Sequence, residues 1–296
     1  MTYARHELTD DLETLPRMPS WVTSARLATP EDVAFLSGAA LSHLHLVLSR
    51  DDVPQTLLRA RLALRAAEAC VTHQGRPERV AELRDAVAFL QPGDSPGPAG
   101  EIYLSWLRAV EGPVLIKTLY RALPEIDAEQ IAVWLNAGQG VPVPRAASVL
   151  QAVFADRLRD PAAALILADA ALAHAVGWSH VLPLLALGLK RGDLQKSGEE
   201  LRLACNRAIV AAAVEATREA TGLARRAARL KEVAPKLRAR GADEAVALFL
   251  DQDAVAPTAL TSLRSDRAAR RFCDRLVAIG AVRELTGRDT FRLYGI

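Results

Sequence analysis

The chain has 296 residues, of which 50% are hydrophobic and 5% aromatic, and its formal net charge is +2. This composition supplies enough apolar side chains for a packed core and excludes a globally disordered chain. The apolar residues are mostly Ala, Leu and Val. Because Ala and Leu favour helices, we expect a mainly α-helical protein.

Charge is distributed unevenly along the sequence. From residue 225 to the end the chain carries 15 basic and 9 acidic residues, whereas the preceding part carries 22 and 26. A mildly acidic body with a basic end indicates a polyanionic partner. A solvated helix face explains the same pattern without any partner, so both interpretations stay open.

Cysteine usage and the apolar stretches point to a reducing compartment. Cys70, Cys205 and Cys273 are widely spaced in apolar helical contexts, and no CxxC occurs, which predicts reduced core residues. The N-terminus has no signal-peptide pattern. The most apolar stretch, 162–176, contains Asp169 and is too short to span a bilayer. We therefore predict a cytoplasmic protein that does not enter a membrane.

The first 240 residues read as an arm and a helical body. Residues 1–28 are polar and aperiodic, which predicts a loose N-terminal arm. Thr29 is a good helix cap, and Pro30 suits the first helical position. From residue 29 to 240 we expect an orthogonal multi-helical body, with helices opening at Thr29, Pro54 and Pro77, others near 101–110, 113–123, 128–136, 144–155, 161–176 and 179–189, and a long one from Ser197 to about Lys231.

Local signals refine this body. Capping boxes are predicted at Asp127 with Gln130 and at Ser197 with Glu200. Residues 91–100 contain three glycines and three prolines, so we expect a loop there inside the body.

Residues 241–296 have the pattern of a C-terminal winged helix-turn-helix with a short β-hairpin. Three helices are expected, over 243–251, 257–263 and 267–279, and Ser265 or Asp266 would cap the third. Alternating strands follow at 281–285 and 290–294. Gly287, in the turn between them, supplies a positive φ.

Helix 267–279 is amphipathic. One face carries apolar residues, namely Ala269, Phe272, Cys273, Leu276, Val277 and Ile279. The basic residues on its other side and in the hairpin turn are Arg267, Arg270, Arg271, Arg275 and Arg288.

These five arginines are the predicted nucleic-acid-binding residues. The helix would lie in the major groove of duplex DNA and the wing would reach the adjacent backbone. Asp266, Asp274 and Asp289 lie among the arginines and oppose phosphate. The alternative is a protein-interaction scaffold whose winged helix mediates dimerisation or partner binding. In either case the helical body would dimerise or bind a protein partner.

Outside the C-terminal unit, the residues that could catalyse a reaction or bind a ligand form no recognisable active-site pattern. His43 and His45 point apart on a helix, so together they cannot chelate a metal. His174 and His180 match no ligand spacing. The loop 138–140 (GQG) precedes Arg145 but lacks a phosphate-binding motif. We therefore expect a non-enzymatic protein with no catalytic residue, metal or cofactor, in which Asp169 makes a buried hydrogen bond.

The chain resembles a known family over almost its whole length. The resemblance rests on residues 57–70 (LLRARLALRAAEAC), 81–100 (AELRDAVAFLQPGDSPGPAG), 182–189 (LPLLALGL), 234–239 (APKLRA) and 265–295 (SDRAARRFCDRLVAIGAVRELTGRDTFRLYG). On these stretches it is similar to a bacterial family catalogued as domain of unknown function 1403. That resemblance adds no catalytic residue.

A second, more distant resemblance is to Fic-like proteins. Residues 283–288 look like the wing that follows Fic-type catalytic cores, and a helical body precedes the wing in both. The Fic motif is His-Pro-Phe-x-x-Gly-Asn-Gly-Arg, and this chain lacks its His, its Asn and its Arg. The loop 138–140 would be a remnant of that motif. This resemblance implies a degenerate Fic-like nucleotide-handling protein as a further alternative.

Overall fold

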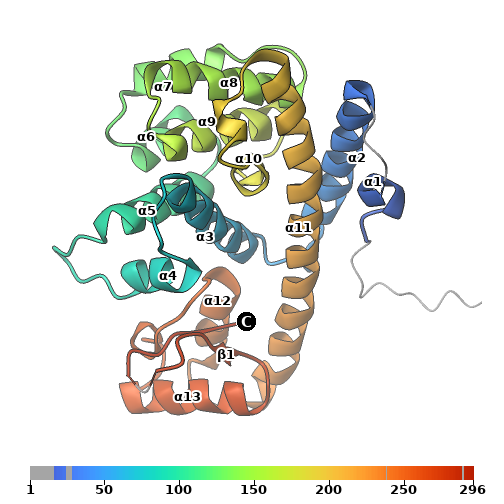
Figure 1. Ribbon diagram of the computed structural model, residues 1–296. Coiled ribbons are helices and arrows are strands. Elements are labelled where there is room, and N and C mark those ends of the chain that lie inside the picture. Colours follow the sequence, from blue (N-terminus) through green and yellow to red (C-terminus); the bar gives the residue numbers. More distant parts are fainter. Residues whose placement is uncertain (1–16, 25–28, 238, 289) are drawn as a thin grey trace, which may run out of the picture.

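The computed structural model describes residues 17–24, 29–237, 239–288 and 290–296, so most of the predicted arm and Asp289 lie outside the described residues. The described chain is mainly helical, as the composition predicts, with a two-stranded sheet near the C-terminus (Figure 1). The helices of the body are α1 (Ser20–Ser24), α2 (Pro30–Leu48), α3 (Gln55–His73), α4 (Val80–Ala88), α5 (Gly97–Glu111), α6 (Ile116–Ala122), α7 (Ala128–Asn136), α8 (Pro142–Asp156), α9 (Pro161–Ala175), α10 (Leu184–Gly188) and α11 (Gly198–Val233), with 3-10 turns η1 (Asp193–Gln195) and η2 (Ala234–Lys236).

Helix α11 is the longest element and runs beside most of the others. Its 36 residues give it a length of roughly 54 Å. It reaches from α8 at one end of the molecule to the C-terminal unit at the other, and α2 lies along its outer side (Figure 1). Alanines recur every fourth residue on its buried face, at 208, 212, 216, 220 and 224. Small side chains at this spacing let neighbouring helices approach closely.

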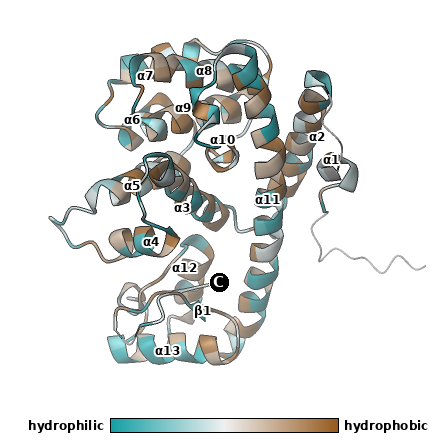
Figure 2. Ribbon diagram, viewed as in Figure 1, coloured by the Kyte–Doolittle hydropathy of each residue, from teal (hydrophilic) through white to brown (hydrophobic). Residues whose placement is uncertain are grey.

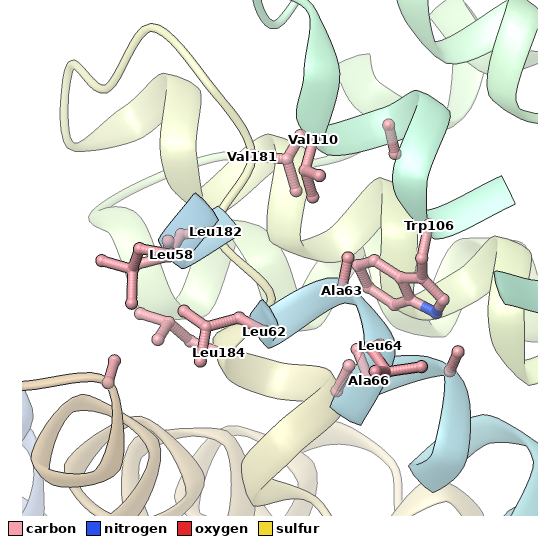
Figure 3. Close-up of a cluster of buried hydrophobic side chains, with 14 of the residues drawn as sticks. Leu58, Leu62, Ala63, Leu64, Ala66, Trp106, Val110, Val181, Leu182 and Leu184 are labelled. Atoms are coloured by element: carbon pink, nitrogen blue, oxygen red, sulfur yellow. The ribbon is translucent and has the colours of Figure 1, made fainter. Parts of the chain in front are cut away.

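The core lies between α3, α5, α9 and α10. Helix α9 is buried on every side from Pro161 to Ala173, which explains why its sequence is apolar throughout. Leu58 and Leu62 of α3 gather with Trp106 of α5 and Leu184 of α10 in one apolar cluster (Figure 3). The three cysteines are free and buried, as predicted. Burial raises the pKa of each thiol to about 12.

Some predicted helix ends are confirmed and others are wrong. Thr29 caps α2 in a capping box with Asp32. Asp127 and Ser197 start their helices but make no side-chain cap hydrogen bond. Next to Ser197, the first amide of α11, that of Gly198, donates to Oε1 of Gln151 on α8 at 3.1 Å.

Two further boundaries differ from the prediction. The loop predicted over 91–100 is shorter, because α5 already begins at Gly97 with Pro98 in its first turn, where no amide donor is needed. No periodicity predicted α1, which lies inside the expected arm and buries Val22 against the core.

The C-terminal unit, residues 241–296, contains α12 (Ala242–Asp251), the 3-10 turn η3 (Pro257–Ala259), α13 (Asp266–Ala278) and strands β1 (Arg283–Glu284) and β2 (Tyr294–Gly295). The strands pair antiparallel, with Glu284 opposite Tyr294. Tyr294 also bridges to Val255 on its other side. The second predicted helix is thus reduced to one 3-10 turn, and both strands are shorter than predicted.

The unit packs against the body beside α3, α4 and α11 (Figure 1). Buried apolar residues of α12 and α13, such as Phe249 and Leu276, belong to the same core cluster as the body. A buried ion pair between Arg61 of α3 and Asp253, after α12, adds a polar contact. The unit therefore has a fixed orientation relative to the helical body.

Candidate nucleic-acid interface

Helix α13 lies along the outer edge of the molecule, with α12 and the hairpin on its inner side (Figure 1). The hydroxyl of Ser265 caps it by accepting from the amide of Ala268 at 3.3 Å, as predicted. Ala269, Phe272, Cys273 and Leu276 are buried, which confirms most of the predicted apolar face. Val277 and Ile279 are exceptions, because they lie at the end of the helix and are 37% and 36% exposed.

Helix α13 carries both hydrophilic and hydrophobic residues (Figure 2), and several of the hydrophilic ones are arginines. Arg267, Arg270 and Arg271 are exposed, and Arg264 is exposed in the turn just before the helix. None of these four makes an ion pair or a side-chain hydrogen bond with the described residues. They form a cluster of cations, the α13 arginine cluster, available to a negatively charged partner. Arg264 was not among the predicted contacts, because it precedes the helix.

Arg275, a predicted contact, has an internal role in the structure. Its guanidinium donates to the main-chain oxygens of Lys236 and Leu237, each at 3.3 Å. It therefore ties α13 to the end of η2 and orients the helix.

Arg288, the predicted wing-tip contact, also has partners inside the chain. Its Nη2 lies 2.8 Å from Oδ2 of Asp85 on α4, and its guanidinium carbon lies 5.5 Å from the ring centroid of Phe89. Phe89 in turn meets the exposed Phe291 edge-on, at 5.7 Å between ring centroids. The turn of the hairpin is therefore held against α4. The sequence contained no signal for this contact, since about 200 residues separate the partners.

A cleft of about 610 Å³ separates α13 from the hairpin and the end of α4. Arg270 and Asp274 line it from α13, and Phe89 and Phe291 line its other side. Asp266 and Asp274 are exposed beside the arginine cluster and reduce its positive potential. Gly287 has φ 63°, which confirms the conformation predicted for the hairpin turn.

His45, His180 and Asp169 make hydrogen bonds in different parts of the structure. Nδ1 of His45 accepts from Nε1 of Trp178 at 3.0 Å, and Nδ1 of His180 lies 2.9 Å from Oγ of Ser179. Asp169 is fully buried and accepts from the first amides of α10, at Leu184, Leu185 and Ala186, which confirms its predicted hydrogen bonding. Within the described ranges, no group of three or more His, Cys, Asp or Glu side chains is arranged to hold a metal ion.

Comparison with protein families matches residues 6–296 to the family described as "Protein of unknown function (DUF1403)". The chain belongs to the DUF1403 family. The match covers the helical body and the C-terminal unit together, and it confirms the resemblance noted from the sequence. A comparison with curated proteins found no match. The similarity of this DUF1403 chain to Fic-like proteins stays a prediction.

No helix in the part of the chain that the structure describes is both long enough and apolar enough to cross a membrane.

Proposed function

We propose that the protein binds duplex DNA through the outer face of α13 and acts as a non-enzymatic, DNA-associated accessory protein. The observation that carries this proposal is the α13 arginine cluster, four exposed guanidinium groups without a partner among the described residues. Elsewhere in the C-terminal unit, Arg275 and Arg288 are engaged within the chain. In the described part of the C-terminal unit, the outer face of α13 thus presents several exposed cations together.

The arrangement of the C-terminal unit supports a winged helix. The order is α12, a short turn η3, α13 and a hairpin, and Val255 extends the hairpin by a bridge to Tyr294. In this class of fold the helix before the hairpin enters the major groove. The 13 residues of α13 give a rod of roughly 20 Å with the arginine cluster along its N-terminal half. Arginine suits both phosphates and the edge of guanine.

In this proposal the five predicted arginines have three different roles. Arg267, Arg270 and Arg271 contact DNA directly, together with Arg264. Arg275 positions the helix through main-chain oxygens at its back. Arg288 contributes to the DNA contact only when it leaves Asp85, because a guanidinium already paired with a carboxylate offers little charge to phosphate.

The salt dependence of binding to a short labelled duplex tests the proposal. About three phosphate contacts predict a fall in affinity of roughly fortyfold between about 50 mM and about 200 mM salt, followed by fluorescence anisotropy. Absence of binding at the lower salt concentration contradicts the proposal. Binding that does not change with salt contradicts the electrostatic mechanism.

A second candidate function, self-association through the helical body, is favoured by a specific apolar surface. Trp21 of α1 and Phe35 and Leu46 of α2 are 50%, 67% and 64% exposed. The rings of Trp21 and Phe35 stack at 5.8 Å. The partner would be a second copy of the chain, packed through the same surface. Light scattering on the protein and on the Phe35→Asp/Leu46→Asp variant tests it: a dimer that the variant abolishes is expected, and a monomeric parent protein contradicts it.

A further inference from the structure

A second cavity, far from α13, lies among the helices α6, α7, α8 and α9 at the other end of the molecule (Figure 1). Its volume is about 440 Å³, which is within the range of small-molecule sites. Its walls combine apolar side chains, among them Leu115, Leu119, Leu135 and Ala170, with polar groups, and it is partly open to solvent. A ligand in this cavity would therefore exchange water for hydrocarbon over part of its surface.

Three polar side chains interrupt the apolar lining: Asn136 at the end of α7, Arg145 on α8 and His174 on α9. None of them makes a side-chain hydrogen bond or ion pair with the described residues; Asn136 and His174 are exposed to solvent, whereas Arg145 is partly buried. Nε of Arg145 is shielded from solvent and has no hydrogen-bond partner. A buried donor of this kind is costly unless something binds to it.

The lining contains no Asp or Glu, so no carboxylate of the described residues neutralises Arg145 in the cavity. Arg145 is partly buried, so it attracts an anion more strongly than a fully solvated cation does, because the local effective dielectric constant is lower. Arginine presents two parallel N–H groups that match the two oxygens of a carboxylate. The charge and geometry of the site therefore favour a carboxylate as the ligand head.

Gly138 fixes the position of Arg145 in this site. A Cβ atom at residue 138 would lie 2.7 Å from Cγ and 2.8 Å from the main-chain oxygen of Arg145. Both distances are too short for a real side chain, so only glycine lets the loop after α7 lie directly on the stem of Arg145. The cavity as a whole brings together the glycine loop, Arg145 and His174, which lie apart in the sequence.

We infer that this cavity is a binding site for a small carboxylate with an apolar body, such as a medium-chain aliphatic or aryl-substituted acid. The carboxylate pairs with the guanidinium of Arg145, within reach of the Asn136 amide and the His174 ring. The apolar body packs against the leucines and alanines of the walls. The site and its ligand are independent of DNA binding by α13.

Titration calorimetry of the full chain tests the inference with four probes: octanoate, 3-phenylpropionate, the neutral analogue octanamide, and inorganic phosphate. At least one of the two carboxylates is expected to bind with a Kd between about 10 µM and about 1 mM. Octanamide is expected to bind at least about tenfold more weakly than octanoate, because it loses the charge-assisted hydrogen bonds. Phosphate, which has no apolar body, is expected to bind more weakly than either carboxylate.

Two variants locate the binding in this cavity. Arg145→Met keeps an apolar stem and removes the cation, and it is expected to weaken carboxylate binding by at least about tenfold. Ala132→Phe places a ring into the cavity from the half-buried face of α7 and is expected to abolish binding without loss of the fold. It tests the site even where Arg145→Met does not fold. Arg159→Met, an exposed arginine after α8, is the matched control and is expected to leave binding unchanged.

Several results would overturn the inference. One is that neither carboxylate binds at concentrations up to about 5 mM. Another is that octanamide or phosphate binds as tightly as octanoate. Carboxylate binding that survives in Ala132→Phe, or in a folded Arg145→Met, or that Arg159→Met lowers equally, places the ligand elsewhere.

Discussion

Arg61 on α3 and Asp253 after α12 form an ion pair that is buried between the helical body and the C-terminal unit; the two residues are 6% and 5% exposed. Arg84 on α4 donates to the other oxygen of Asp253 at 2.7 Å. Arg61 also pairs with Glu219 of α11 and donates to the main-chain oxygen of Ile296, at 3.3 and 3.2 Å. One carboxylate and two guanidinium groups thus fix the orientation of the C-terminal unit, and with it the direction in which α13 faces.

Removing the charge of Asp253 leaves Arg84 without its carboxylate and leaves the buried Arg61 with only one of its two carboxylate partners, Glu219. Asp253→Asn is therefore expected to lower the free energy of unfolding by about 3 kcal/mol, measured by urea denaturation. Glu111→Gln provides the control, because it breaks an ion pair with Arg121 in which both side chains are more than half exposed. It is expected to change stability by less than about 1 kcal/mol. Equal effects of the two substitutions would contradict this role of Asp253.

Asp169 makes the stability of the protein depend on pH. Burial raises the pKa of its carboxyl to about 7, although hydrogen bonds from the amides of Leu185, Ala186 and Leu184 act in the opposite direction. The folded state therefore holds this proton up to a higher pH than the unfolded state does. As pH rises, the unfolded chain ionises first, so stability decreases between the two pKa values and is constant above the folded one.

The Asp169→Asn variant isolates this contribution. The difference in unfolding free energy between the parent protein and the variant is expected to shift against the parent by about 2 kcal/mol from about pH 5 to about pH 7. It is expected to level off near pH 8, and urea denaturation across this pH range measures it. A difference that stays constant with pH would show that Asp169 has an ordinary pKa.

Gly241 is required where α12 begins. Its φ of 81° is unfavourable for other residues, and an added Cβ would lie 2.2 Å from the main-chain oxygen of Ser262. Gly241→Ala is expected to destabilise the protein by about 2 kcal/mol or more, seen as a lower midpoint of thermal unfolding. Gly192→Ala is the matched control, since a Cβ there meets nothing within 4 Å and φ is −68°. A similar loss in both variants would mean that the contact with Ser262 does not matter.

The ion pair between Arg288 and Asp85 predicts that removing Asp85 strengthens DNA binding. Asp85→Ala releases Arg288 from α4 and removes a negative charge near the hairpin. Under the proposed function, affinity for duplex DNA at low salt is expected to rise about threefold, and the salt dependence to steepen by about one contact. Arg288→Ala combined with Asp85→Ala should cancel the gain. If the double variant keeps it, the effect comes from the lost carboxylate alone.

The sequence correctly predicted several features of the C-terminal unit that depend on local signals. Ser265 as a cap, Gly287 at positive φ and the apolar face of α13 follow from spacing and turn chemistry, and the structure agrees. The predicted length of the second helix in the C-terminal unit was wrong, because only three of the predicted residues are helical, and these form a 3-10 turn. Periodicity cannot distinguish a short helix from a turn that tertiary contacts hold.

Contacts between distant residues could not be predicted from one sequence. The arginines of α13 looked equivalent on a helical wheel, yet Arg275 is bonded to the end of η2, whereas Arg267 is free of such contacts with the described residues. The partner of Arg288 lies on α4. The cavity around Arg145 joins segments separated by up to about sixty residues, each of which carried only a weak signal alone.

The most direct test of the central proposal is the affinity for a short DNA duplex of the Arg267→Glu/Arg271→Glu variant at low salt. A loss of at least about tenfold relative to the parent protein is expected, because two phosphate-facing cations become anions. Lys117→Glu/Arg159→Glu changes the net charge equally through two exposed residues at the other end of the molecule, and it should lower affinity by less than about threefold. Equal losses in the two variants, or no loss in the first, would contradict DNA binding through α13.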